Sequence, residues 1–265
     1  MLDTFFRGAS YPFQGLRWLS RPQVRRFVIV PLLVNIILFS VVIVWGISEF
    51  GALIDSLLAR LPEWLDWLRW LLWPLFAITT LVVSFYTFSL VANLIASPFN
   101  SLLAERVEDL ASPGQVRPQG APLWKEIVLS PLAELKKLVY FLIRAVPLLV
   151  LFFIPGINVA APLLWVAFTA WMLALQYVDY PMGNHLFPFR DQRRILGERR
   201  LLALGFGAAV LLITLVPVLN FLAMPASVIG ATLMWVEQFP ELKRSIPMTA
   251  ADAAAPLPPS GSPGN

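Results

Sequence analysis

Residues 20–35 read SRPQVRRFVIVPLLVN, a basic segment with a proline near its start that leads directly into a charge-free apolar run. Ser20 can cap a helix whose first turn contains Pro22, because a proline there loses no intrahelical hydrogen bond. Arg25 and Arg26 follow in this turn, where unpaired amide N–H groups and the helix dipole already supply partial positive charge. The segment therefore predicts a site for a small oxyanion at a membrane boundary, although such arginines also occur as a plain topology signal on the cytoplasmic flank of a membrane helix.

Composition places the chain among integral membrane proteins. Of its 265 residues, 58% are hydrophobic and 14% are charged, and its mean hydropathy is +0.73. Soluble domains have roughly 45–50% apolar and about 25% charged residues. The absence of cysteine excludes thiolate catalysis and cysteine-bound metals, and a single histidine leaves no histidine pair for a zinc site. We therefore expect no enzyme, no cofactor and no metal, and the net charge of +4 suits anionic lipids or an anionic substrate.

The hydrophobic pattern predicts an all-α membrane fold with two long spanning helices. Residues 27–47 and 71–104 carry no charge, and the second stretch is longer than the roughly 20 residues of one crossing, so it must tilt, kink or continue past the bilayer. Residues 51–70 between them are rich in tryptophan, which is typical of a membrane interface. Residues 4–19 and 123–144 mix apolar residues with charge, as interfacial amphipathic helices do. Five arginines and one aspartate precede the first crossing, so the positive-inside rule places the N-terminus in the cytoplasm.

Two further hydrophobic regions share an internal signature. Residues 145–178 and 201–236 are uncharged, and near the middle of each a P-x-x-N motif, ending in Asn158 or Asn220, is followed by alanine and proline. Proline and asparagine form turns, so each region is expected to fold as a helical hairpin with arms of about 16 residues. Such arms span roughly 24 Å against a hydrocarbon core near 30 Å, which favours hairpins that turn back inside the membrane over complete short crossings. Turn backbone at that depth needs protein or water around it, which makes both asparagines candidates for a transport pathway.

The end of the second long apolar stretch carries two more candidates. The sequence SPFN, which ends in Asn100, interrupts the helical pattern, and Glu105 and Glu108 follow at helical spacing. The plain interpretation is a solvated helix end with its carboxylates toward the cytoplasm. The functional interpretation places Glu105 and Asn100 at an aqueous pathway or at a contact between subunits.

The remaining segments read as polar connections. Residues 109–122 are rich in proline and glycine and predict a loop. Residues 179–200 hold five arginines against three acids and predict a cytoplasmic loop, in which His185 is most simply a loop histidine. Residues 247–265 predict a disordered tail behind an integral membrane domain of residues 1–246.

Five motifs together make the chain resemble the CysZ-type sulfate permeases of bacterial inner membranes, over about the first 245 residues. In chain order they are PQVRRFVIVPLLVN, ASPFNSLLAERVE, QYVDYPMGNH with FPFRDQRR, the paired P-x-x-N turns, and GATLMWVE. The resemblance implies two long spanning helices and two half-inserted hairpins, assembled as a homo-oligomer. It also implies uptake of sulfate for cysteine biosynthesis.

The resemblance further implies where the anion binds. The family's sulfate-binding motif, Gly-Leu-Arg-Arg after a proline, falls on Gln23, Val24, Arg25 and Arg26. The arginines match, whereas Gln23 replaces the glycine that would allow close approach of the backbone. The family's acidic position near the pore falls on Glu105. The implied partners are sulfate, with sulfite or a related oxyanion as an open alternative, the lipid bilayer and further copies of the chain, but no nucleic acid.

Two alternatives from other functional classes stay open. A membrane scaffold could use the hairpins as wedges that deform a bilayer, and a regulator of another transporter would bind its partner without carrying flux. The sequence contains no Walker motif, so ATP hydrolysis is not expected on this chain.

Overall fold

The structure is a computed structural model that describes residues 1–30, 98–113 and 123–244, with positions 33–34, 36–37, 40–41, 56, 74–75, 78–79, 81–82 and 86. Every regular element among these residues is a helix, which confirms the predicted all-α class. The chain divides into two compact units, residues 22–102 and residues 1–21 with 103–265, and each is described by itself. Most of the two expected spanning helices, 27–47 and 71–104, lies outside the described residues.

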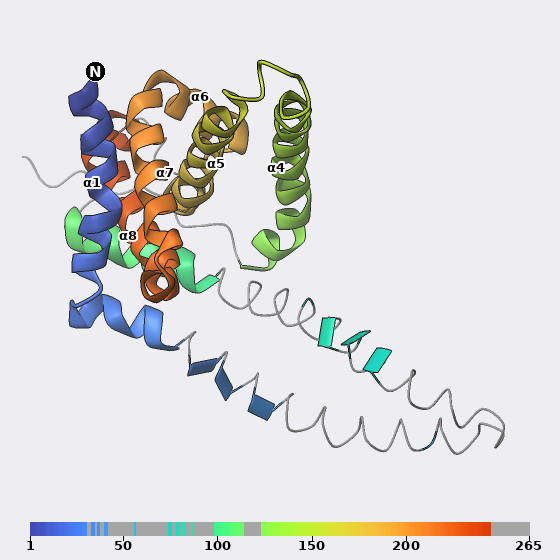
Figure 1. The fold of residues 1–265 in the computed structure, drawn as a ribbon. Helices are drawn as coiled ribbons and strands as arrows, with labels where there is room; N and C mark the ends of the chain where they lie inside the picture. Colours follow the sequence, from blue (N-terminus) through green and yellow to red (C-terminus); the bar gives the residue numbers. More distant parts are fainter. Residues whose placement is uncertain are drawn as a thin grey trace, which may run out of the picture. The chain divides into compact units, whose positions relative to one another are not determined.

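Helix α1 (Leu2–Trp18) packs along α7 (Arg200–Leu215) and α8 (Pro217–Gln238), as Figure 1 shows. The buried residues of α1 recur every three or four positions and so lie on one side of the helix: Gly8, Tyr11, Pro12 and Gly15. The N-terminal segment predicted as amphipathic is thus helical, and its buried side is covered by two later helices.

Helices α4 (Leu123–Leu151) and α5 (Ala161–Asn184) form a first hairpin. The connection between them contains Gly156, whose φ of +85° is rarely adopted by residues with a side chain. Asn158 lies in the same connection, so the turn falls where the P-x-x-N motif predicts it. Helix α5 has 24 residues, more than the expected arm of about 16, because it continues beyond Val178 into the polar segment.

Helices α7 and α8 form a second hairpin with a much tighter connection. Only Val216, with extended φ and ψ of −90° and 112°, separates the two helices. Pro217 occupies the first position of α8, where its missing N–H costs no hydrogen bond, and Asn220 lies in the first helical turn. The two P-x-x-N motifs are therefore alike in sequence but differ in structure, since Asn158 lies in a loop and Asn220 in a helix.

The predicted cytoplasmic loop, residues 179–200, is mostly helical, so the predicted loop conformation is wrong, whereas its cytoplasmic side stays a prediction. Helix α5 extends to Asn184, and α6 (Phe189–Glu198) follows after a short link. The buried residues of α6 lie on one face of an amphipathic helix: Gln192, Ile195 and Leu196. A last short helix, α9 (Pro240–Arg244), follows α8, and the predicted tail lies outside the described residues.

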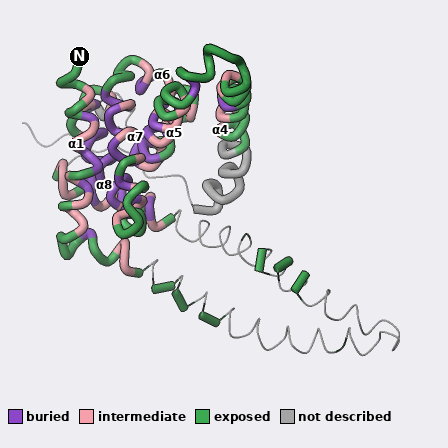
Figure 2. Tube along the Cα trace, in the orientation of Figure 1, coloured by how far each residue is buried: buried purple, intermediate pink, exposed green. Residues whose placement is uncertain are grey.

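The core lies among α1, α5, α7 and α8, where the buried residues concentrate (Figure 2). Among the described helices, α5 and α8 are long and apolar enough to cross a membrane. Their 24 and 22 residues span about 36 and 33 Å, against a hydrocarbon core of roughly 30 Å. These lengths allow complete crossings, so half-inserted hairpins stay a prediction.

Glycines permit close backbone contact between these helices. A Cβ added to Gly207 of α7 would overlap the carbonyl oxygen of Ala170 of α5. A Cβ added to Gly205 would overlap the carbonyl oxygen of Phe5 of α1. Small residues at helix contacts are typical of membrane proteins, where close backbone approach supplies much of the packing energy.

Candidate functional site

The predicted anion site begins at Pro22, the first residue of a helical segment that includes residues 22–30. The cap position is therefore Arg21 and not Ser20, which corrects the prediction by one residue. The Ser20 hydroxyl instead donates a hydrogen bond of 2.8 Å to the carbonyl oxygen of Arg17, at the end of α1. The first amides of a helix have no intrahelical partners, so this end offers N–H donors to a ligand.

Three of the four predicted site residues have exposed side chains. Gln23, Arg25 and Arg26 are exposed, whereas Val24 is fully buried. The Arg26 guanidinium lies 5.0 Å from the ring centre of its neighbour Phe27, within the range of a cation–π contact. Two exposed guanidinium groups beside free amides suit a tetrahedral oxyanion, because both groups donate charge-assisted hydrogen bonds.

Asn100 and Glu105 lie on one helical segment, residues 98–111. Asn100 is buried and Glu105 is half-buried, and neither lacks an interaction partner. Glu105 is therefore not the fully solvated carboxylate of the plain interpretation. Whether it lines a pathway or a subunit contact stays a prediction.

Asn158 and Asn220 belong to different hairpins and are both exposed. The backbone N–H of Asn158 donates to the carbonyl oxygen of Ile154 at 3.0 Å, and that of Asn220 donates to Val216 at 2.8 Å. Both asparagines thus help to form the bends of the hairpins, and their role in a pathway stays a prediction.

A buried acid–imidazole pair lies where the sequence predicts only polar surface. The Nε2 atom of His185, at the C-terminal end of α5, lies 3.0 Å from each carboxylate oxygen of Glu108. The side chains are only 3% and 4% exposed, so Glu108 is not the solvated carboxylate of the sequence analysis. His185 does lie in the link that follows α5, as predicted, but it is buried and paired there. The ring of Trp235 in α8 lies 5.5 Å from the imidazole, centre to centre. Within the described part of the chain, no group of three His, Cys, Asp or Glu side chains could hold a metal ion.

A second polar network joins α4, α5 and α6. Lys137 donates to Asp179 at 2.5 Å, and the Nε2 atom of Gln192 donates to the other oxygen of that carboxylate at 2.7 Å. Gln192 is buried and also donates to the carbonyl oxygen of Phe187 at 2.9 Å. Asp179, His185 and Gln192 all come from the motifs QYVDYPMGNH and FPFRDQRR, so these motifs hold the helices together.

Known proteins match this chain over most of its length. The sequence pattern of the family described as "Sulfate transporter CysZ/Etoposide-induced protein 2.4" matches residues 11–225. A protein of Pectobacterium atrosepticum named sulfate transporter CysZ is 44% identical over 243 residues, which cover 91% of this chain and 88% of that relative. Proteins of the same name from Pseudomonas aeruginosa and Salmonella typhi are 40% and 46% identical, each over 87% of this chain, and over 95% and 92% of the respective relative. The matched range contains both the helix start at Pro22 and the Glu108–His185 pair.

Proposed function

This chain belongs to the family of the sulfate transporter CysZ and the etoposide-induced protein 2.4, and we propose on that basis that it carries sulfate across the bacterial inner membrane. The relatives are named as transporters and not as enzymes. The apolar helices α5 and α8 support membrane insertion. In this proposal, transport is inward, and the imported sulfate supplies cysteine biosynthesis.

The anion binds at Gln23, Val24, Arg25 and Arg26. The observation that supports this site is the exposure of both arginine side chains in the first turn of a helix that begins at Pro22. Sulfate must lose part of its hydration shell to enter a membrane, and guanidinium groups and free amides replace those hydrogen bonds. The positive end of the helix dipole adds to the attraction.

The site must also release the anion. A permeation site binds well enough to attract its ion and weakly enough to let it leave. The arginines are exposed rather than enclosed, so water competes for their donors, and this favours modest affinity. Sulfite and related oxyanions share the tetrahedral or pyramidal charge distribution that the site recognises.

Other polar residues complete the pathway in this proposal. A carboxylate repels sulfate, so Glu105 acts at a subunit contact or as a charge that promotes release. The exposed Asn158 and Asn220 offer amide groups that bind an anion without trapping it, and the buried Asn100 supports the helix beside the pathway. The hairpins are half-inserted, the N-terminus is cytoplasmic, and the protein works as a homo-oligomer.

Isothermal titration of the purified protein with sodium sulfate tests the site. Arg25→Gln/Arg26→Gln should weaken sulfate binding at least tenfold, because each hydrogen bond to a charged group contributes roughly 1.5–3 kcal/mol. The matched pair Arg7→Gln/Arg17→Gln changes the net charge equally at exposed positions of α1 and should leave binding unchanged. Equal sulfate affinities of the two double variants would show that sulfate binds elsewhere on the protein. A parent that deforms vesicles but neither binds nor carries sulfate would support the scaffold alternative.

A further inference from the structure

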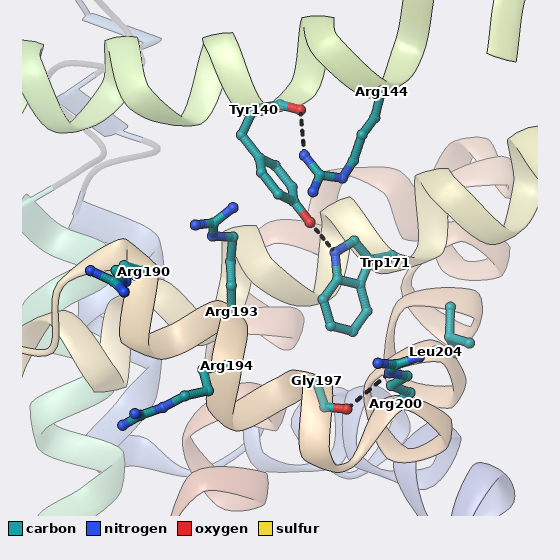
Figure 3. Close-up of a pocket in the computed structure, with 9 residues that line it drawn as sticks. All are labelled: Tyr140, Arg144, Trp171, Arg190, Arg193, Arg194, Gly197, Arg200 and Leu204. Carbon is teal, nitrogen blue, oxygen red and sulfur yellow. Dashed lines mark hydrogen bonds between the residues drawn. The ribbon is translucent and has the colours of Figure 1, made fainter. Parts of the chain in front are cut away.

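A second cationic site lies far along the chain from the helix start at Pro22. Helices α4, α5, α6 and α7 surround an open cavity of about 660 Å³ (Figure 3). Its described lining contains five arginines, two aromatic residues and two small or apolar ones: Arg144, Arg190, Arg193, Arg194, Arg200, Tyr140, Trp171, Gly197 and Leu204. None of these lining residues carries a carboxylate.

The nearby acids do not neutralise this cavity. Asp191 lies 3.9 Å from Arg194, but the two side chains are 38% and 74% exposed, so water screens the pair. Asp179 is occupied by Lys137 and Gln192. The cavity therefore keeps a positive potential that favours an anion.

The ring of Tyr140 contacts two of the five arginines, and Arg144 also donates one N–H to the carbonyl oxygen of Tyr140 at 3.4 Å (Figure 3). The guanidinium of Arg144 lies 3.6 Å from the ring centre of Tyr140, and that of Arg193 lies 4.6 Å from the same ring. The Tyr140 hydroxyl accepts a hydrogen bond of 3.0 Å from Trp171, which fixes the wall between α4 and α5. Arg200 uses its Nε to donate to the carbonyl oxygen of Gly197 at 3.0 Å. Cation–π contacts engage the face of a guanidinium, so its N–H edge stays able to bind a phosphate.

The size of the cavity and its surroundings point to a lipid rather than a free ion. A water molecule takes up about 30 Å³ of liquid, so a single tetrahedral ion would leave most of the cavity to solvent. On α4, beside Tyr140 and Arg144, the apolar residues Val139, Leu142 and Ile143 are 46%, 46% and 64% exposed. In a membrane protein, such a surface faces acyl chains. Basic pockets between membrane helices bind phospholipid head groups, and aromatic residues mark head-group depth.

We propose that this arginine-lined cavity binds the phosphate of an anionic phospholipid, whose acyl chains lie along the exposed apolar side of α4. The bound lipid bridges four helices and supplies the negative charge that the described lining lacks. This site is separate from the proposed sulfate site and does not depend on transport.

Native mass spectrometry of the full-length protein in a neutral detergent tests the proposal. Phosphatidylglycerol should be retained, and phosphatidylcholine of the same chain length should not. Arg193→Gln/Arg200→Gln should weaken retention of phosphatidylglycerol by roughly 25-fold, from about a fivefold loss for each of the two basic contacts. The matched pair Arg7→Gln/Arg199→Gln changes the charge equally. Arg199 is the sequence neighbour of Arg200 but contacts Gln238 and Phe239 instead, so this control should retain the lipid as the parent does.

Three results would overturn the proposal. The first is equal retention of phosphatidylglycerol and phosphatidylcholine by the parent. The second is an equal loss of phosphatidylglycerol from both double variants. The third is retention of phosphatidylglycerol by Arg193→Gln/Arg200→Gln at the level of the parent. Displacement of the retained phosphatidylglycerol from the parent by millimolar sulfate or phosphate would assign the cavity to a free anion instead. If the double variant does not fold, the exposed Arg200→Gln and Arg199→Gln single variants make the same comparison.

Discussion

The imidazole Nε2 of His185 lies 3.0 Å from both carboxylate oxygens of Glu108, and the two side chains are almost fully buried. Removing one member of such a pair leaves the other without its partner in a site that water does not reach. Glu108→Ala should therefore lower the free energy of unfolding by about 3 kcal/mol. Denaturation in detergent, followed by circular dichroism, measures this change.

A matched control removes an exposed carboxylate from the same unit. Glu198→Ala changes an exposed residue of α6 and should alter stability by less than about 0.5 kcal/mol. Equal stability of the two variants would show that the buried pair contributes nothing.

The buried Tyr11 of α1 is hydrogen-bonded to the last two residues of α8. Its hydroxyl donates to Glu237 at 2.8 Å and accepts a hydrogen bond of 2.8 Å from Gln238. Tyr11→Phe removes both bonds and should cost about 1–2 kcal/mol at neutral pH. Tyr86→Phe, at an exposed position, should cost far less in the same measurement.

The same tyrosine should make stability depend on alkaline pH. Burial, and next the hydrogen bond to Glu237, raise the pKa of Tyr11 from 10.0 to about 12. The folded state thus keeps a proton that the unfolded chain loses first, so this contribution is complete below pH 10 and disappears as the pH approaches 12. The thermal midpoint of the parent should fall more steeply over this interval than that of Tyr11→Phe. Parallel curves for the two proteins would contradict the assignment.

The contact between α5 and α7 leaves no room for a side chain at Gly207. Gly207→Ala should destabilise the protein although alanine is the better helix former, because its Cβ would meet the backbone of Ala170. At Gly197 of α6, a Cβ would have nothing within 4 Å, so Gly197→Ala should be neutral or stabilising by up to about 1 kcal/mol. Thermal midpoints that rank these variants in the opposite order would contradict the packing of the two helices.

Gln23 offers a gain-of-affinity test. A glycine at this exposed position would let an anion approach the backbone amides more closely. Gln23→Gly should therefore bind sulfate several-fold more tightly, as measured by isothermal titration. Gln23→Ala also removes the amide side chain but keeps a Cβ, so it serves as the control. If Gln23→Ala binds sulfate as tightly as Gln23→Gly, the gain comes from loss of the glutamine side chain and not from closer approach of the anion to the backbone.

The class of the fold could be predicted from the sequence because hydrophobicity acts over long stretches. Uncharged runs with a central proline and asparagine located both hairpins, and both connections lie at those motifs. The helix lengths were harder to predict, since α5 continues through charged and polar residues once Asp179 is paired with Lys137. A charge ends an apolar run in sequence but need not end a helix.

Helix α6 and the buried pair of His185 and Glu108 could not be predicted from charge counts for a related reason. Charge counting assigned residues 179–200 to a loop, yet the spacing of Gln192, Ile195 and Leu196 is that of a half-buried helix and could have revealed α6. No local signal pairs His185 with Glu108, because the two residues are far apart in the chain and meet only after the helices pack. The residues of the proposed anion site, by contrast, were chosen by local rules for a helix start, and three of the four have exposed side chains.

Uptake of radiolabelled sulfate into liposomes tests the central claim most directly. The parent and Arg7→Gln/Arg17→Gln should take up sulfate equally, whereas Arg25→Gln/Arg26→Gln should lose at least nine-tenths of the initial rate while remaining folded and inserted. Unchanged uptake by the Arg25/Arg26 variant would contradict the proposed site, and a folded parent that carries no sulfate under any ion gradient would contradict the proposed function itself.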